Sequence, residues 1–279
     1  MPSSSEINSS LIPQIPSDAW IIGDVHGCRE TLKELLKRID ALHGDAHRIF
    51  IGDLVGKGPD SFGVMQDLMD QSHRTTVTLG NHDLHLLGCR RNAAQPRASD
   101  MTEPLLQLPQ GHPWESWLAG QPYVCEIHSG TDEEPRRYRM VHAGIHPSWD
   151  DRELQSRLEA LTSATRGSDW NWYQQRKGPL WESASTLTRI RCLNRRDLKA
   201  DFDFTGTPEE ADGSLIPWYE ALPDGPDCPT YVFGHWARLG WREGLRGHCV
   251  DTACVYGGSL TAFQPLTGKV LTQPSCESA

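Results

Sequence analysis

The sequence has no apolar run long enough to cross a membrane, and its N-terminus lacks the basic and apolar regions of a signal peptide. Residues 1–17 are rich in Ser and Pro and contain no Lys or Arg. We expect them to form a flexible leader, and we expect a cytoplasmic protein with no membrane partner.

Basic residues are also scarce, since 27 Lys and Arg stand against 37 Asp and Glu, a formal net charge of −10 at pH 7. Proteins that bind DNA along its backbone present a basic face, so we expect no DNA partner. A small anionic substrate is compatible with this charge if cations, including bound metal ions, gather at one place.

The eight cysteines form no Cys-x-x-Cys pair, and their scattered spacing in 279 residues favours reduced thiols over a disulfide framework. A phosphate-binding P-loop is excluded as well, although residues 52–58 are rich in glycine. These residues lack the Walker spacing and the Ser or Thr that would follow Lys57.

Short apolar strands and amphipathic helices alternate in the first third of the chain. The pattern predicts strands over residues 20–22, 48–51 and 75–79, and helices over 32–42 and 62–69. Such units give parallel strands with crossover helices, and sites form beyond the carboxyl ends of these strands.

The rest of the chain is less regular. Prolines break residues 84–121, which we expect to form short helices inserted between core strands, and residues 162–211 give no clear assignment. We further predict a strand over 138–141, a helix over 150–161, a strand over 231–233, a terminal β-hairpin region containing 249–251 and 259–263, and a frayed tail over 273–279.

Side chains that can bind metal follow five of the predicted strands: Asp24 and His26, Asp53, Asn81 and His82, His142, and His235. Asp24 and His26 lie two residues apart, so in extended backbone both face the same way. Taken singly, His142 and His235 also fit hydrogen-bonded core histidines, and Asn81 fits a turn residue. Their joint occurrence after strands and beside glycine favours a common site.

This donor set mixes carboxylate and imidazole and contains no Cys, which suits manganese, iron, cobalt or zinc. Asp53 lies in the middle of the series, and its two carboxylate oxygens could bridge two ions. Two ions about 3.5–4 Å apart can activate water and steady the attacking and leaving oxygens of a displacement at phosphorus. The residues therefore predict hydrolysis of a phosphoester or phosphoanhydride.

Five motifs, in this order, resemble those of the calcineurin-like metallophosphatases: Gly-Asp-Val-His-Gly at 23–27, Gly-Asp-Leu-Val-Gly-Lys-Gly at 52–58, Gly-Asn-His-Asp at 80–83, His-Ala-Gly at 142–144 and Gly-His-Trp at 234–236. Within that superfamily, GNHDLHLL at 80–87, VHAGIHPSWD at 141–150 and DTACVYGGSL at 251–260 resemble the symmetrical bis(5'-nucleosyl)-tetraphosphatases. The resemblance extends over residues 20–263.

The resemblance implies an α/β fold, a metallophosphatase sandwich of two mixed β-sheets flanked by helices with a helical insertion over the site, in one domain over residues 18–272. It implies symmetric hydrolysis of diadenosine tetraphosphate to two ADP, with RNA 5' ends capped by a nucleoside tetraphosphate as a further substrate. It also implies two divalent ions, manganese first, with cobalt, iron and zinc as alternatives.

Carried over to this sequence, the family pattern implies that Asp24, His26 and Asp53 hold one ion and that Asp53, Asn81, His142 and His235 hold the other. His82 matches the residue that protonates the leaving oxygen. Arg189 and Arg191 resemble phosphate-binding arginines, although a solvated basic face would also explain them.

Two positions depart from the family pattern. Lys57 stands where the family usually has an arginine, and lysine offers a point charge where arginine offers a planar fork. Gly56 stands where Ser/Thr protein phosphatases carry an Asp that orients the catalytic His. The partner of His82 therefore stays open, with Asp251 as one candidate.

Two other functions compete with the dinucleotide hydrolase: a Ser/Thr protein phosphatase and a non-catalytic dinucleotide sensor. The ligand set and His82 argue against a sensor, since a binder needs no proton donor. Trp149, Trp236 and Tyr256 could stack on a nucleobase, but packing in the core or at the rim is the favoured explanation for each. The oligomeric state stays open.

Overall fold

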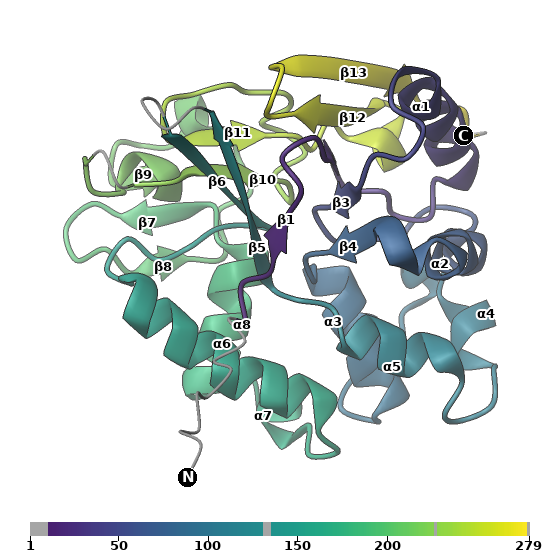
Figure 1. Ribbon diagram of the computed structural model, residues 1–279. Coiled ribbons are helices and arrows are strands. Elements are labelled where there is room, and N and C mark those ends of the chain that lie inside the picture. Colours follow the sequence, from purple (N-terminus) through teal and green to yellow (C-terminus); the bar gives the residue numbers. More distant parts are fainter. Residues whose placement is uncertain (1–10, 131–134, 226–227, 278–279) are drawn as a thin grey trace, which may run out of the picture.

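The structure is a computed structural model that describes residues 11–130, 135–225 and 228–277. In these residues two five-stranded sheets lie side by side and helices cover them (Figure 1). The first sheet has the order β13-β12-β2-β3-β4 and the second the order β1-β5-β6-β10-β11. Both combine parallel and antiparallel pairs, which confirms the predicted sandwich of mixed sheets.

The strands of the first sheet are β2 (Trp20–Ile22), β3 (Arg48–Phe50), β4 (Thr75–Val77), β12 (Ser259–Gln264) and β13 (Lys269–Pro274). Those of the second are β1 (Gln14–Ile15), β5 (Val124–Gly130), β6 (Pro135–Val141), β10 (Thr230–Phe233) and β11 (Gly247–Cys249). A small third sheet contains β7 (Cys192–Asn194), β8 (Ala200–Asp201) and β9 (Leu215–Pro217).

The helices are α1 (Arg29–Leu42), α2 (Ser61–Asp70), α3 (Asn81–Arg90), α4 (Glu103–Leu106), α5 (Pro113–Ala119), α6 (Asp151–Arg166), α7 (Asn171–Gln175) and α8 (Pro179–Arg189). Single 3-10 turns are η1 (Ser72–Arg74), η2 (Ala98–Asp100), η3 (Pro208–Glu210), η4 (Trp218–Glu220) and η5 (Cys254–Tyr256). None of the helices in the described part of the chain is both long and apolar enough to span a membrane.

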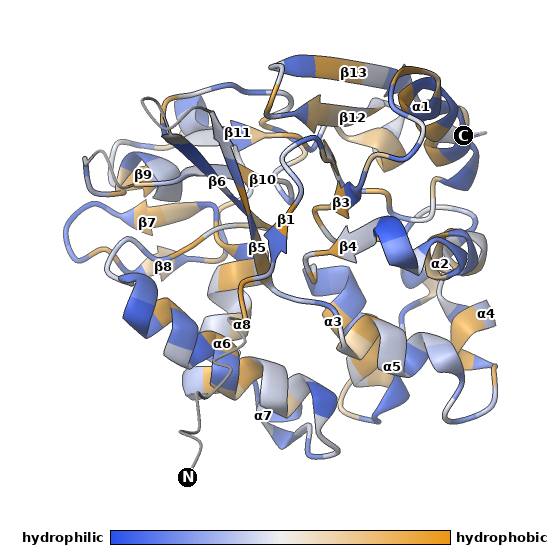
Figure 2. Ribbon diagram, in the orientation of Figure 1, coloured by the Kyte–Doolittle hydropathy of each residue, from blue (hydrophilic) through white to orange (hydrophobic). Residues whose placement is uncertain are grey.

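Successive side chains of β2 point to opposite faces of the first sheet, and both faces are packed. Ile21 lies in a buried cluster with Met140 and Val232 of the second sheet, whereas Trp20 and Ile22 point into the larger core beneath the helices. In Figure 2, β10 and β12 carry hydrophobic residues, while α1 and α6 are hydrophilic over much of their surface. Strand β2 is buried on both faces, which explains its continuous apolar run.

The first predicted units are confirmed. β2, β3 and β4 are parallel neighbours with Ile21 opposite Ile49 and Ile49 opposite Thr76, and α1 and α2 form the crossovers. Their carboxyl ends therefore lie at one edge of the first sheet, where the predicted metal ligands follow.

The predicted pairing of residues 249–251 with 259–263 is wrong. Cys249 belongs to β11, which pairs in parallel with β10 in the second sheet, and the hairpin is formed by β12 and β13. The outer strand β13 was missed because its side chains are mostly exposed, so it has little of the hydrophobic pattern that marks a strand.

The predicted ends of the domain also change. Residues 1–10 of the expected leader lie outside the described residues, but Gln14 and Ile15 form β1 on the second sheet. At the other end β13 reaches Pro274, and the backbone N–H of Cys276 donates to the Thr31 hydroxyl at 2.8 Å. Both segments are thus attached to the fold by hydrogen bonds.

Candidate metal centre

The predicted ligands meet in one cavity of about 680 Å³ beyond the strand ends. Its lining includes the expected metal-binding and proton-donating side chains Asp24, His26, Asp53, Asn81, His82 and His235. Fully buried His142 follows β6 and lies behind Asp53, with its Nε2 3.5 Å from Asp53 Oδ2. The structure thus brings together all the side chains that the sequence assigned to two ions.

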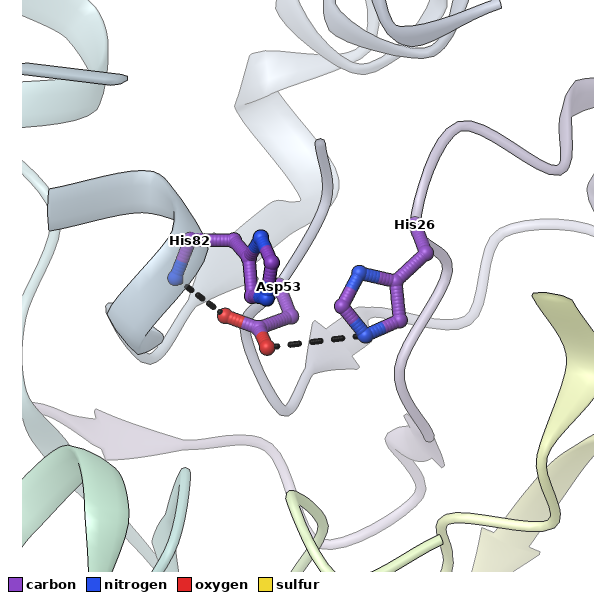
Figure 3. Close-up of side chains that lie close together, drawn as sticks. All are labelled: His26, Asp53 and His82. Atoms are coloured by element: carbon purple, nitrogen blue, oxygen red, sulfur yellow. Dashed lines mark hydrogen bonds and ion pairs between the residues drawn. The ribbon is translucent and has the colours of Figure 1, made fainter. Parts of the chain in front are cut away.

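His26, Asp53 and His82 form the first cluster of possible ligands, and their side chains converge in Figure 3. His26 Nε2 lies 3.6 Å from Asp53 Oδ2, and the rings of His26 and His82 meet edge to face with centroids 4.9 Å apart. The backbone N–H of His82 donates to Asp53 Oδ1 at 2.8 Å. This bond orients the carboxylate so that its other oxygen faces the imidazoles.

Asp53, His142 and His235 form the second cluster, so Asp53 belongs to both. Asn81 joins it because its Oδ1 lies 3.3 Å from His142 Nε2. His142 Nδ1 donates to the Ile51 carbonyl at 2.6 Å, which leaves the lone pair of the neutral ring on Nε2, the nitrogen nearest Asn81 and Asp53. A carboxylate that bridges two ions must lie within reach of both ligand clusters, and Asp53 does.

Asp24 lines the same cavity as most of the other predicted ligands. Its two oxygens accept the backbone N–H of His235 at 3.2 and 3.1 Å, and it lines the cavity without joining either tight cluster. The role of Asp24 as a ligand stays a prediction.

The backbone bends sharply at several of these residues. His26, Asp53 and His235 have φ values of 49°, 46° and 63°, in the left-handed region that side chains other than glycine seldom adopt. Strain of this kind is retained where the surrounding structure enforces it, and it gathers at functional sites. Here it turns each side chain from the end of its strand back toward the common cavity.

The pKa shifts at the site favour neutral histidines and an ionised Asp53 at pH 7. Burial lowers the pKa of His26 to about 3, and burial likewise lowers the pKa values of His142 and His235, so these imidazoles are neutral at pH 7. Burial would raise the pKa of Asp53, but the adjacent imidazoles and the N–H of His82 hold it at about 2. Neutral imidazoles around an ionised carboxylate are the protonation states that metal ligands need.

The other buried carboxylates are held less easily in the charged form. Burial, followed by repulsion from Asp251 and Asp53, raises the pKa of Asp24 well above its usual value. Burial and the charge of Asp53 also raise the pKa of Asp251 to about 6. A divalent cation would relieve this concentration of negative charge.

His235 tests whether the residues fit a metal ion. Its Nε2 is buried and has no hydrogen-bond partner among the described residues, which is costly for a polar atom unless something else binds it. A free imidazole nitrogen beside Asp53 is a good donor for a divalent transition metal. The residues present therefore fit the implied ions.

The three predicted phosphate-binding cations, Lys57, Arg189 and Arg191, all line the metal cavity. The Lys57 ammonium donates to the Tyr256 hydroxyl at 2.6 Å and lies 5.0 Å from that ring's centroid. Arg191 Nη2 donates to the His235 carbonyl at 3.2 Å. Their contact with phosphate stays a prediction, but the alternative of a dispersed basic face does not fit their common cavity.

Position 56, a glycine where protein phosphatases carry an Asp, has no room for a side chain beside His82. Its φ is +94°, and a Cβ at this position would lie 2.6 Å from His82 Nδ1. An Asp here would combine backbone strain with a clash against the imidazole. Asp251 does not replace it, since its Oδ1 accepts the N–H of Ala253 at 3.0 Å and, in the part of the chain described, no hydrogen bond joins it to His82.

The aromatic candidates separate clearly. Trp149 borders another cavity, where Arg157 stacks over it at 4.5 Å, and Trp236 is buried with its Nε1 donating to the Gly206 carbonyl at 2.8 Å. Trp236 and Tyr256 both line the metal cavity, but Trp236 is 1% exposed and Tyr256 is 64% exposed, so Tyr256 offers far more surface to a nucleobase.

Asp83 was missed as a functional residue although it lies within the Gly-Asn-His-Asp motif. Its carboxylate accepts the backbone N–H groups of Leu54 and Gly80, both at 3.0 Å, and so ties the Asp53 loop to the start of α3. Burial, followed by the charge of Asp53, raises its pKa to about 7. Its place one residue after His82 was the only signal in the sequence.

The helical insertion lies beside the metal cavity and not over it. α4 and α5 pack against α2 and α3, and neither helix contributes to the lining of this cavity. Helix α8 was not assigned from the sequence, although Leu180, Ala184 and Leu187 recur at helical spacing. Arg189, the last residue of α8, reaches the cavity.

Comparison with known proteins gives consistent results. The family model described as calcineurin-like phosphoesterase matches residues 18–239. A protein named symmetrical bis(5'-nucleosyl)-tetraphosphatase from Janthinobacterium sp. (strain Marseille) is 30% identical over 275 residues, covering 92% of this chain and 96% of its own length. One of the same name from Escherichia coli O139:H28 (strain E24377A / ETEC) is 34% identical over 277 residues, covering 92% and 95%.

Solved structures agree with this similarity. A crystal structure provisionally assigned as a diadenosine tetraphosphatase has a TM-score of 0.66 and 26% identity, covering 96% of this chain and 99% of its own. A Ser/Thr phosphatase from Saccharomyces cerevisiae has a TM-score of 0.55 and 12% identity, covering 97% and 85%. The second likeness concerns the fold alone.

Proposed function

The chain belongs to the calcineurin-like phosphoesterase family, and we propose that it hydrolyses dinucleoside tetraphosphates symmetrically, turning diadenosine tetraphosphate and water into two ADP. The observation that carries the chemistry is that two clusters of possible metal ligands share Asp53. The substrate is supported by the name of the relatives that are 30% and 34% identical over 92% of this chain.

In this proposal Asp24, His26 and Asp53 hold one divalent ion, and Asp53, Asn81, His142 and His235 hold the other. Manganese is the first choice, with cobalt, iron and zinc as alternatives. When bound, the two ions supply Lewis-acid activation of water and neutralise charge at the attacked phosphorus.

His82 donates the proton that the departing oxygen needs. Burial lowers the pKa of His82 and the nearby Asp53 raises it. An approaching polyphosphate adds further negative charge, which favours the protonated ring at the moment of reaction. Lys57, Arg189 and Arg191 bind the phosphates and offset the charge that develops on the departing half.

A nucleoside tetraphosphate at an RNA 5' end offers the same anhydride, so we include such capped RNA among the substrates. The eight cysteines are all free in the structure, which supports a cytoplasmic setting. Gly56 weighs against the Ser/Thr protein phosphatase alternative, because the acid that those enzymes place beside the catalytic histidine has no room here.

Product analysis tests the proposal. Chromatography of early products from diadenosine tetraphosphate with Mn²⁺ should give ADP almost alone, and ¹⁸O from labelled water should enter the terminal phosphate of one of the two ADP molecules. AMP and ATP in equal amounts would refute the symmetric cut. A phosphopeptide hydrolysed as fast as diadenosine tetraphosphate would instead support a protein phosphatase, and tight binding without turnover would support a sensor.

A further inference from the structure

A second, smaller cavity adjoins the metal cavity and has a volume of about 180 Å³. The two cavities share Asn81, His82 and Arg189 in their linings. The remaining walls of the smaller cavity come from α3, the segment around Arg97, and the helices α7 and α8. His82 therefore lies at the boundary between two spaces that one elongated ligand could fill together.

The smaller cavity is lined by guanidinium groups that lack carboxylate partners. Arg97, Arg176 and Arg189 all contribute to its lining, and across the described ranges none of them forms an ion pair. This is notable in a chain whose 37 acidic residues outnumber its 27 basic ones. The acid in the lining, Asp100, is already engaged by His85 Nε2 at 3.0 Å and by the N–H of Arg97 at 2.8 Å.

One residue of the lining, Ser185, also carries a buried hydroxyl without a partner among the described residues. Ser185 on α8 is only 3% exposed, and its Oγ has no hydrogen bond among the described residues. Its helix neighbours are satisfied, since Ser183 accepts from Arg157 Nη1 at 3.1 Å and Thr188 donates to the Ala184 carbonyl at 2.7 Å. A single unsatisfied hydroxyl in such a helix is costly unless a ligand completes it.

Two aromatic rings, with planes 76° apart, supply apolar surface. Tyr173 and Trp181 line the cavity with their ring centroids 5.5 Å apart, and the Arg176 guanidinium lies 5.9 Å from the Trp181 centroid. Rings of this kind bind a nucleobase by stacking, whereas guanidinium groups and hydroxyls bind phosphate. The cavity thus combines the chemistry of both ends of a nucleotide.

We propose that the smaller cavity receives the departing nucleoside diphosphate, with its phosphates on Arg189, Arg97 and Ser185 and its base against Trp181 and Tyr173. This inference rests on the proposed function. The metal cavity then keeps the attacked half, and His82 stands where the two halves separate. The arrangement gives a physical reason for a cut in the middle of the phosphate chain, since each half has its own cavity.

Paired serine variants of α8 test the assignment by ADP binding to metal-free protein, measured by calorimetry. Ser185→Ala should leave the melting temperature unchanged or raised, because an unsatisfied buried hydroxyl is removed, yet raise the Kd for ADP about tenfold. The control Ser183→Ala should do the opposite, lowering the melting temperature through loss of the Arg157 bond while leaving the Kd unchanged.

Paired variants of a surface turn test the charge. Arg176→Ala should raise the Kd for ADP, and Lys177→Ala, which removes a neighbouring exposed charge outside the lining, should not. With Mn²⁺ present, Arg176→Ala should lower kcat/KM for diadenosine tetraphosphate but spare p-nitrophenyl phosphate, whose leaving group carries no nucleotide. Both variants retain the hydrophobic core, so a loss of folding is not expected.

The outcomes separate the two proposals. Suppose the protein hydrolyses diadenosine tetraphosphate, but its Kd for ADP is unchanged by both Ser185→Ala and Arg176→Ala, or it does not bind ADP at all. That result would overturn the assignment of the smaller cavity and leave the proposed function standing. ADP binding that depends on both residues in a protein without such turnover would refute the proposed function and keep the cavity as a nucleoside-diphosphate site.

Discussion

Asp53→Asn is the sharpest test of the bridging carboxylate. Asp53 Oδ1 accepts the His82 N–H at 2.8 Å, while Oδ2 lies 3.6 Å from His26 Nε2 and 3.5 Å from His142 Nε2. An asparagine amide would keep the bond from His82 through its own oxygen. Its NH₂ group would then stand where Oδ2 stood, and an amide nitrogen does not bind a divalent cation.

The size of the effect follows from this geometry. Loss of a group that merely supports a ligand costs about 10- to 100-fold in metal affinity. Loss of a ligand shared by both clusters should therefore cost at least about 100-fold at each position. Removal of one group that stabilises the transition state typically lowers kcat about 10²–10³-fold. We expect Asp53→Asn to lower kcat by at least this factor.

Elemental analysis after dialysis against Mn²⁺ measures the stoichiometry, and we expect it to fall toward one ion per chain or fewer. Asp67→Asn is the matched control, since Asp67 pairs with Arg29 at 2.7 Å outside the cavity. Two ions retained with normal turnover would refute the bridging role.

Variants at three further positions address the proton donor His82, the phosphate-binding cation Lys57 and Gly56 beside the imidazole. His82→Asn should lower kcat about 10²–10⁴-fold with metal content intact, and equal losses on substrates with good and poor leaving groups would count against a proton donor. Lys57→Arg should preserve or improve kcat/KM and Lys57→Ala should impair it, so unchanged kinetics in the alanine variant would place Lys57 in solvent. Gly56→Ala should lower kcat by displacing His82 and destabilise the fold by about 1–3 kcal/mol, whereas Gly111→Ala, with a positive φ of +77° but open space around it, should cost stability without loss of kcat.

The part of the site that the sequence predicted is the part built from local segments. Asp24, His26 and Asp53 follow their strands within a few residues, so the end of each strand also places its ligand. Since β2, β3 and β4 are parallel neighbours, three local patterns were enough to predict one site. His82 and Asn81 follow by the same reasoning at the start of α3.

The parts that escaped prediction depend on contacts between distant segments. Asp24 accepts a hydrogen bond from the backbone N–H of His235, which lies 211 residues away in the sequence. The residues next to Asp24 in the sequence do not predict this partner. Ser185 and Arg176 belong to residues 162–211, which have no assignment from the sequence, although Leu180, Ala184 and Leu187 of α8 recur at helical spacing. Their relation to His82 exists only once α3, α7 and α8 are packed together.

The chain has a negative net charge, yet it can bind a polyanionic substrate because several cations without carboxylate partners among the described residues line the two cavities. Some arginines outside the two cavities are paired with carboxylates: Arg29 is bound by Asp60 and Asp67, and Arg139 by Glu126 and Asp151. Arg238, in the lining of the metal cavity, is paired with Glu210. Around the two cavities the described cations Lys57, Arg97, Arg176, Arg189 and Arg191 form no ion pair with a carboxylate. Divalent ions at the buried acids would add further positive charge in the same place. The local field at the site can therefore attract phosphate while the surface as a whole repels long polyanions such as DNA, since a cavity concentrates the field of the charges that line it.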